Sequence, residues 1–472
     1  MRRFLFICFL ALITCPAVVP AGDRPHLFVY LSDDHSYFDT SLYGATDIPM
    51  PEMERLAADG ISFTHAFVAS PACAPSRAAM LTGLMPARNG AEANHTYPAE
   101  GTHFLIEDLK AAGYRVAAFG KVAHAKDLEP YGFDYSSPAR EHALLLQEVN
   151  EFIEREGSDS PLCLFVGTSN PHVPWPLKNT FDPSEVEIPG VHLDTPETRK
   201  LRAAYYQEIS DLDTLLGDLR EIAAEELGDN TVFVHTSDHG SQWPFGKWNL
   251  YDYGIRVPLL VSWPGVIEAG VRTDAMVSWI DLLPTLMDLA GGAPRPGIDG
   301  ESFLGVLTGE EKSHRDTIFT THSGDGEMNV FPIRAIRTGD WKLIHNLRPD
   351  LAHTNHSDVL RKRSAGSYWN EWAALAKEEA EAQAVLERYF QRPEFELYHV
   401  SVDPWETENL IDLPSQQDRV ERLKERLLDW MTSQGDTGEI FDEPRPLAKP
   451  ERWHPDFFKK PAAFKKKKSK GE

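Results

Sequence analysis

Five short runs of apolar residues in the first two thirds of the chain predict buried strands. They lie at residues 26–32, 115–120, 162–168, 231–237 and 257–263. Amphipathic stretches, which are typical of surface helices, lie at residues 51–59, 103–112, 138–156, 196–227 and 279–290. Buried strands that alternate with helices indicate a mostly parallel sheet with helices on both faces. We therefore predict an α/β fold for this part of the chain.

The pattern changes after about residue 310. Three runs predict antiparallel strands, at residues 332–338, 341–347 and 395–400, and two charged segments predict helices, at 370–390 and 416–433. A Gly/Pro-rich stretch (291–300) and a charged turn (309–315) mark the boundary. We predict a main α/β domain over residues 22–310 and a smaller α+β subdomain, with an antiparallel sheet, over residues 311–445.

The two ends of the chain differ in composition from the rest. Residues 1–21 combine an Arg pair with a short apolar run, which predicts a signal peptide and a secreted or periplasmic protein. The run is too short for a transmembrane helix, so we expect no stable membrane anchor. Thr14 makes Cys15 a poor lipidation site. Residues 446–472 are rich in Lys and predict a disordered tail.

The charge of the chain limits its partners. The sequence has 47 Lys and Arg against 72 Asp and Glu, a formal net charge of -25. A nucleic-acid binder normally carries a basic surface, so we expect no nucleic-acid partner. An anionic substrate would need a pocket built from a few local cations. Two cysteines lie beyond the leader. One of them, Cys163, lies in an apolar run, so we predict that it is a buried core residue.

Acidic side chains follow two of the predicted strands. Asp33 and Asp34 come directly after the strand at 26–32, and Asp238 and His239 follow the strand at 231–237. Ligands of parallel sheets bind at the carboxyl ends of strands. If the two strands are neighbours, these four side chains converge on one divalent cation, which prefers oxygen ligands. An ordinary acidic turn is the alternative for either pair alone.

Cys73 lies in a polar, Pro-containing turn, Ser70-Pro71-Ala72-Cys73-Ala74-Pro75-Ser76-Arg77. Pro75 is suited to the first turn of a helix, which would put Cys73 at a helix N-terminus. The dipole and the free N–H groups there favour negative charge and activate a thiol.

The run from Cys73 to Gly83, Cys-x-Pro-Ser-Arg-x-x-x-Leu-Thr-Gly, resembles the signature of the formylglycine-dependent sulfatases. The resemblance extends from about residue 25 to Asp403-Pro404-Trp405-Glu406-Thr407-Glu408-Asn409-Leu410. It implies an alkaline-phosphatase-like fold. It also implies that a formylglycine-generating enzyme oxidises Cys73 to formylglycine before the protein is active.

The resemblance implies a role for each matching residue. Asp33, Asp34, Asp238 and His239, together with residue 73, would bind one Ca²⁺ ion, although many members have Asn where this chain has His239. Lys121 and Lys247 would bind the sulfate, and Arg77 would help to neutralise it. His124 would take a proton from residue 73, although its Lys-x-x-His spacing differs from the more common Lys-x-His. His172, or alternatively Lys247, would protonate the leaving oxygen.

Further segments resemble the heparan N-sulfatase (sulfamidase) and iduronate-sulfatase-like branches of the family. These are Trp243 to Tyr251, Arg334 to Arg337 and Lys342 to Leu347. They imply a sulfated carbohydrate substrate, with a sulfate ester or a sulfamate cleaved. The candidate sugar contacts from the second domain are His322, Asp325 and Arg337, whereas His65 and His95 are expected to be structural or at the rim of the site. Asn94 and Asn355 begin glycosylation sequons.

We therefore expect an exported sulfatase that acts on a sulfated carbohydrate. One alternative is a phosphate mono- or diester hydrolase of the same superfamily, since Asp and His also bind Zn²⁺ in such enzymes. Another is a non-catalytic glycan-binding protein in which Cys73 stays unmodified.

Overall fold

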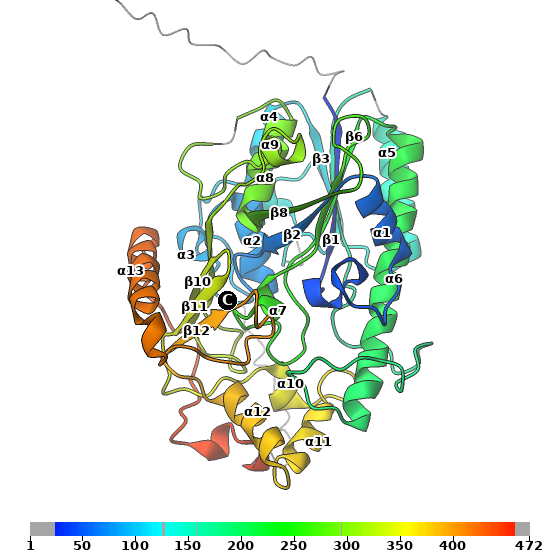
Figure 1. The fold of residues 1–472 in the computed structure, drawn as a ribbon. Helices are drawn as coiled ribbons and strands as arrows, with labels where there is room; N and C mark the ends of the chain where they lie inside the picture. Colours follow the sequence, from blue (N-terminus) through cyan, green and yellow to red (C-terminus); the bar gives the residue numbers. More distant parts are fainter. Residues whose placement is uncertain (1–23, 125–127, 158, 294, 458–472) are drawn as a thin grey trace, which may run out of the picture.

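The larger of two sheets forms the centre of the molecule (Figure 1). A computed structural model describes residues 24–124, 128–157, 159–293 and 295–457. The eight strands of this sheet have the order β4-β3-β5-β1-β6-β7-β2-β8, and only β7 runs antiparallel to its neighbours. Their bounds are β1 His26–Ser32, β2 Ile61–Phe67, β3 Arg115–Gly120, β4 Tyr135–Ser137, β5 Leu162–Gly167, β6 Thr231–Ser237, β7 Leu259–Ser262 and β8 Val271–Ser278.

The predicted mostly parallel sheet is confirmed, and each of the five predicted strands is present. The prediction missed β2, β4 and β8. Residues Val271 to Asp274 of β8 alternate between half-buried and exposed, and β2 carries Thr64 and His65 at half-buried positions. A search for continuous apolar runs finds strands that are buried on both faces, and it misses strands that are partly open to solvent.

Helices cover both faces of this sheet. In Figure 1, α1, α5 and α6 lie on one side of it, and α2, α4 and α8 lie on the other. The long helix α6 begins where Thr195 accepts a hydrogen bond from the Thr198 N–H and Pro196 takes the first helical position. The helices of this part are α1 Pro51–Ala58, α2 Cys73–Thr82, α3 Pro86–Asn89, α4 Leu105–Ala111, α5 His142–Glu156, α6 Pro196–Glu226, α7 Asp252–Ile255, α8 Leu282–Leu289 and α9 Leu304–Leu307.

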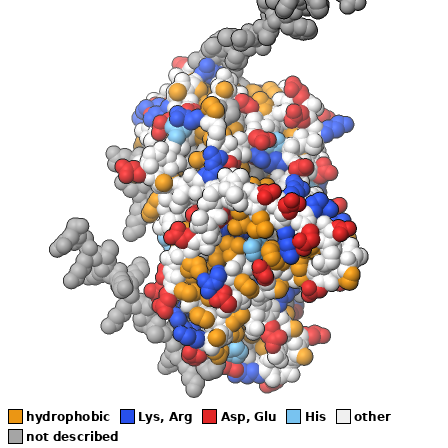
Figure 2. All heavy atoms as spheres, turned by 90° about the vertical axis from the view of Figure 1, so that its left-hand side faces the viewer, with side chains coloured by type: hydrophobic (Ala, Val, Ile, Leu, Met, Phe, Trp, Pro, Cys, Tyr) orange, Lys and Arg blue, Asp and Glu red, His pale blue; other side chains and the backbone are white. Residues whose placement is uncertain are grey.

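A four-stranded antiparallel sheet, in the order β12-β11-β10-β9, follows in the chain. Its strands are β9 Thr317–His322, β10 Ile333–Thr338, β11 Trp341–Asn346 and β12 Phe395–His399, and its helices are α10 His356–Leu360, α11 Tyr368–Leu375, α12 Ala380–Phe390 and α13 Gln417–Gln434. Leu423 and Leu427 of α13 pack with Ile336 and Leu343 of the sheet. Figure 2 shows the side of the molecule that carries α13, where acidic and basic side chains are interspersed.

The predicted single helix over 370–390 is wrong, because the chain breaks it into α11 and α12. A continuous helix would hold Trp369 and Tyr389 about 30 Å apart, at 1.5 Å per residue. In the structure their ring centroids are 4.7 Å apart. Folding the two helices onto each other buries these aromatic rings together, and that burial favours the break over a straight, mostly solvated helix.

The predicted domain boundary at residue 310 lies between α9 and β9, and the division into domains stays a prediction. Residues 446–457, at the start of the predicted tail, belong to the folded part of the chain, because Trp453 is buried against Phe390. The predicted signal peptide and the tail lysines other than Lys449 lie outside the described residues. Over the part of the chain that the structure describes, no helix is both long and apolar enough to cross a membrane.

Candidate active site around Cys73

Cys73 is the first residue of α2, as the sequence predicts. Arg77 of this helix donates to the carbonyl of Ser32, the last residue of β1, at 3.3 Å. Strand β1 pairs in parallel with β6 from His26 to Ser32. Ser76 fixes this position, since its hydroxyl donates to the Asp238 carbonyl at 2.6 Å. Every residue of α2 is buried.

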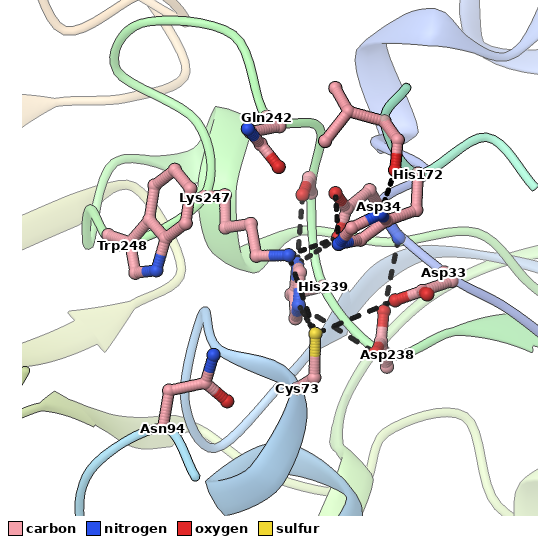
Figure 3. Close-up of polar contacts among 12 residues, drawn as sticks. Asp33, Asp34, Cys73, Asn94, His172, Asp238, His239, Gln242, Lys247 and Trp248 are labelled. Atoms are coloured by element: carbon pink, nitrogen blue, oxygen red, sulfur yellow. Dashed lines mark hydrogen bonds and ion pairs between the residues drawn. The ribbon is translucent and has the colours of Figure 1, made fainter. Parts of the chain in front are cut away.

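Four polar side chains surround the Cys73 sulfur, and Figure 3 labels three of them, Asp33, His239 and Lys247. His239 Nε2 lies 3.3 Å from Sγ, Lys247 Nζ 3.4 Å and Lys121 Nζ 3.5 Å. Asp33 Oδ1 lies 3.6 Å away. Two ammonium groups within 3.5 Å of one sulfur form a site in which negative charge on residue 73, or on an anion bound beside it, is stabilised.

The charges of the protein balance one another around this sulfur. Lys121 pairs with Asp33, and Lys247 Nζ lies 2.8 Å from Asp34 Oδ1. Arg77 Nε donates to Asp238 Oδ2 at 2.9 Å. Three buried carboxylates thus face three buried cations, and the charge of a bound divalent cation would be left to attract an anionic substrate.

The pKa values of these groups follow from the pairing. Burial alone would raise the pKa of Cys73, but the ammonium groups of Lys121 and Lys247 hold it well below its usual range. Burial would likewise raise the pKa of Asp33, and Lys121 again reverses the shift. Burial raises the pKa of Asp238 to about 7, against the opposing effect of Arg77. The site therefore favours a thiolate at residue 73.

The ligand atoms of four side chains lie within 4.8 Å of one another, and these side chains are Asp33, Asp34, Cys73 and His239. Asp34 Oδ2 is buried and has no hydrogen-bond partner among the described residues. A buried carboxylate oxygen without a partner, beside a second carboxylate, fits a hard divalent cation. Asp238 lies next to this set, with Oδ2 3.7 Å from His239 Nε2, and its carboxylate is engaged by Arg77.

The backbone is strained at three residues of the site. Asp34 has φ 73°, His95 has φ 66° and Trp248 has φ 67°, in the left-handed region that favours glycine. The Asp34 N–H donates to Asp238 Oδ1 at 3.1 Å, and the Trp248 N–H donates to the Pro71 carbonyl at 2.9 Å. Such conformations persist where the surroundings enforce them, and they concentrate at functional sites.

A cavity of about 330 Å³ opens onto Cys73. His124, His172 and Lys247, three of the predicted site residues, line it, and so does Asp325 from the second part of the chain. His172 Nε2 lies 3.9 Å from Asp34 Oδ2. His95, which was expected to be structural or at the rim of the site, also lines this cavity. So do residues to which the prediction gave no role there: Asn94, Gln242, Trp248, His356 and Lys362.

Two predicted sugar contacts lie elsewhere. His322 is fully buried, with Nε2 2.8 Å from Asn329 Oδ1. Arg337 lines a different cavity of about 700 Å³, as does His65. The structure therefore brings only Asp325 of the three predicted sugar contacts to the cavity at Cys73.

The sequon asparagines are both buried and hydrogen-bonded. Asn94 Oδ1 accepts from the Ala74 N–H at 3.1 Å, and Asn355 caps α10 by accepting from the Ser357 N–H at 2.8 Å. The fold thus uses both side chains internally, where a glycan has no room. Cys163 is likewise buried in β5 and unpaired, as predicted for a core residue.

Comparisons with known proteins identify the family of this chain. The sulfatase family profile matches residues 25–293, and the C-terminal profile of N-sulphoglucosamine sulphohydrolase matches residues 239–355. An ulvan-active sulfatase of Formosa agariphila is 29% identical, over 88% of this chain and 81% of that protein. The human N-sulphoglucosamine sulphohydrolase is 27% identical, over 86% of this chain and 90% of that protein.

A solved structure with a similar fold contains its substrate, D-glucosamine-2-N,6-O-disulfate. It has a TM-score of 0.68 and 20% sequence identity, and the match covers 88% of this chain and 99% of that one. The family profile covers more than half of the sequence and establishes that the chain belongs to the sulfatase family.

Proposed function

We propose that this protein is an exported, formylglycine-dependent sulfatase that removes sulfate groups from a sulfated carbohydrate. The observation that carries the proposal is the position of Cys73, at a buried helix N-terminus within 3.5 Å of two ammonium groups. A sulfate ester repels nucleophiles because its oxygens are anionic, so a nucleophile flanked by cations is what its hydrolysis needs.

Asp33, Asp34, His239 and residue 73 would hold one divalent cation, which we propose to be Ca²⁺ with Asp238 beside it. Such a cation would supply positive charge at the sulfate oxygens. Carboxylate oxygens suit Ca²⁺, whereas a His ligand is more common for transition metals. Metal analysis of the purified protein, with re-addition of Ca²⁺, Mg²⁺ and Zn²⁺ after chelation, distinguishes these ions.

Oxidation of Cys73 by a formylglycine-generating enzyme would supply a hydrated aldehyde whose hydroxyl attacks sulfur. The residues of the chain then have separate tasks. Lys121 and Lys247 bind the sulfate oxygens, and Arg77 holds Asp238 in place. His172, at the opening of the cavity, donates a proton to the leaving oxygen, with Lys247 as the alternative donor. His124 accepts the proton of the second hydroxyl at residue 73.

The substrate class rests on the relatives. Those reported above are named for ulvan and for N-sulphoglucosamine, and the solved structure holds a sulfated glucosamine. A cavity of about 330 Å³ accommodates roughly one sugar ring with its sulfate. We therefore propose a terminal sulfated sugar unit as substrate, with a sulfate ester or a sulfamate as the bond cleaved.

The decisive experiment compares matched substrates. Purified protein co-expressed with a formylglycine-generating enzyme is assayed on aryl sulfate and aryl phosphate, and then on N-sulfated and O-sulfated disaccharides. We expect kcat/KM to be higher on the sulfate than on the phosphate. A preference for the phosphate would instead support the phosphohydrolase. No turnover on any substrate, together with saturable binding of the disaccharides, would support the glycan-binding protein.

A further inference from the structure

A chain of three side chains forms one wall of the cavity at Cys73. His124 follows β3, His95 lies in the loop between α3 and α4, and Asp325 follows β9. His124 Nε2 lies 2.8 Å from His95 Nδ1, and His95 Nε2 lies 3.3 Å from Asp325 Oδ1. All three residues line the cavity. Three separate segments thus place an imidazole, a second imidazole and a carboxylate in one row.

Asp325 is a fixed negative charge at the end of this row. Its side chain is 3% exposed. Oδ2 accepts hydrogen bonds from Trp248 Nε1 at 2.7 Å and from Asn94 Nδ2 at 3.0 Å. Burial alone would raise the pKa of Asp325, but the bond from His95 and the other donors hold it well below its usual range. Oδ1 has no hydrogen bond of normal geometry among the described residues, and its ion-pair contact is with His95 Nε2 at 3.3 Å.

An anionic Asp325 decides where the protons of both imidazoles sit. Because a carboxylate only accepts, the proton of a neutral His95 lies on Nε2, and His95 Nδ1 then carries a lone pair. His95 Nδ1 then accepts from His124, so the proton of His124 lies on its Nε2. This leaves His124 Nδ1 as a bare lone pair. That atom is buried and has no hydrogen-bond partner in the described part of the chain.

We propose that His95 and Asp325 are positioning residues that hold His124 in the tautomer whose Nδ1 is free to act as a base. When His124 takes up a proton, His95 shares the resulting positive charge and Asp325 stabilises it. The proposal rests on the proposed function, because His124 is the base assigned there. It adds two residues that the sequence analysis left without this role, since His95 was expected to be structural or at the rim and Asp325 to contact a sugar.

The row is anchored to the nucleophile as well as to the second part of the chain. Asn94, the residue before His95, accepts from the Ala74 N–H at 3.1 Å and donates to Asp325. Ala74 follows Cys73 in the first turn of α2. The same short loop therefore sets the distance between residue 73 and the row, so that the base and the nucleophile move together.

The proton balance of the step is closed. The O–H bond of the second hydroxyl at residue 73 breaks, and its proton moves to His124 Nδ1. The electron pair of that bond forms the aldehyde C=O, and the bond from the same carbon to the sulfate oxygen breaks with its electrons on the sulfate. The Nε2 proton of His124 moves toward His95 Nδ1, and the positive charge on His95 faces Asp325. No oxidant or further reactant is needed.

The test uses the full-length enzyme with [¹⁵N]histidine, in which NMR distinguishes the two neutral tautomers of each imidazole. The His124 signals are assigned by their loss in His124→Gln. We expect the Nε2–H tautomer of His124 in the wild type, and a mixture of tautomers in His95→Gln and Asp325→Asn. The side chain of His95 is 61% exposed, so His95→Gln is expected to fold even if Asp325→Asn does not.

His356→Gln is the matched control. His356 Nδ1 also lies near Asp325, at 3.7 Å, and lines the same cavity, but it is not part of the row. We expect it to leave the His124 tautomer unchanged. A wild-type His124 with its proton on Nδ1, or a tautomer that stays the same in His95→Gln, would overturn the proposal.

A second readout follows the covalent step. In His95→Gln, release of sulfate from residue 73 should slow about 10- to 100-fold, so that rapid-quench mass spectrometry finds enzyme with sulfate attached and kcat and KM fall together. A rise in KM alone, with no attached sulfate, would show that His95 only contacts the substrate. The NMR measurement does not depend on turnover. An inactive protein with the expected His124 tautomer would therefore contradict the proposed function but support the positioning role of His95 and Asp325.

Discussion

Two cavities of this protein are lined by cations, and they differ in what those cations bind. In the larger, of about 700 Å³, each arginine has structural partners. Arg202 pairs with Asp39, Arg256 donates to the Thr64 carbonyl, and Arg337 donates to two backbone carbonyls and contacts Asp252 at 3.4 Å. In the smaller, Lys247 pairs with Asp34 and also reaches the Cys73 sulfur.

The difference shows that cavity size does not identify the site. The larger cavity lies beside ion pairs such as Arg202–Asp39 and Arg337–Asp252, whereas the smaller one is lined by the Cys73 thiol and by the row of two imidazoles and a carboxylate. Cations whose donors are all engaged stabilise the fold. Cations that face a reactive atom provide a binding site for an anion.

The largest effect is expected at Cys73. Cys73→Ala should lower kcat/KM about 10⁴-fold or more, because no other residue supplies the covalent step. The midpoint temperature of its thermal unfolding should stay within a few degrees of the wild-type value, since the sulfur is small and α2 is held by other hydrogen bonds. Activity above a few per cent of the wild type would place the nucleophile elsewhere.

Lys247→Ala tests the cations of the smaller cavity. We expect kcat/KM to fall about 10²- to 10³-fold, because a preorganised charge at the sulfate is lost and Asp34 loses its partner. Steady-state kinetics at several ionic strengths measure this effect. A loss that vanishes at high salt would mean that Lys247 only attracts the substrate from a distance.

His172→Gln separates the two candidate proton donors. If His172 protonates the leaving oxygen, kcat of the variant should fall about 10²-fold on a sugar sulfate, which has a poor leaving group. On an aryl sulfate kcat should fall much less. Equal losses on both substrates would instead assign the proton to Lys247. The readout is the slope of log kcat against leaving-group pKa in the two proteins.

Arg337→Gln tests the larger cavity and, unlike the preceding variants, should lower stability more than activity. Removal of a buried charge that contacts Asp252 should cost about 3–5 kcal/mol of unfolding free energy. We expect kcat/KM to change less than about 3-fold, because Arg337 does not line the cavity at Cys73. A large loss of kcat/KM in a stable variant would return Arg337 to the substrate site that the sequence predicted.

The smallest effect is expected at Asp358, in α10 beside the smaller cavity. Burial raises its pKa to about 7, against the effects of the Asn355 N–H, Tyr389, Arg445 and Arg361. The folded state then binds a proton that the unfolded state releases near pH 4, so stability falls as the pH rises from about 4 to 7, by about 1 kcal/mol per unit. Asp358→Asn should flatten this slope in denaturant titrations, and an unchanged slope would contradict the assignment.

Much of the site was predictable because its residues follow strands or lie in one continuous motif. Asp33, Asp34 and Asp238 come directly after β1 and β6, and the neighbouring, parallel arrangement of these strands brings them together. The motif at Cys73 includes Pro75, which is suited to the first turn of a helix, so the motif also predicts where α2 begins. The local sequence pattern was sufficient to predict these positions, because a parallel sheet brings the ends of neighbouring strands together.

The wall of the cavity was not predictable in the same way. His95, His124 and Asp325 come from loops that are far apart in the sequence, and nothing in their local spacing says that they meet. His322 was expected to contact a sugar, yet its strand turns it into the core. Which loops converge depends on strand order and on packing between the two sheets, and neither follows from the composition of a loop.

The central claim is that residue 73, once oxidised, is the nucleophile of a sulfatase. Its most direct test is the mass of the tryptic peptide that contains residue 73, measured in preparations with graded amounts of the formylglycine-generating enzyme, beside the rate of sulfate release from a sulfated disaccharide. We predict that the rate rises in proportion to the fraction of peptide with formylglycine and extrapolates to zero without it. Full activity in protein whose Cys73 is unmodified would contradict the account.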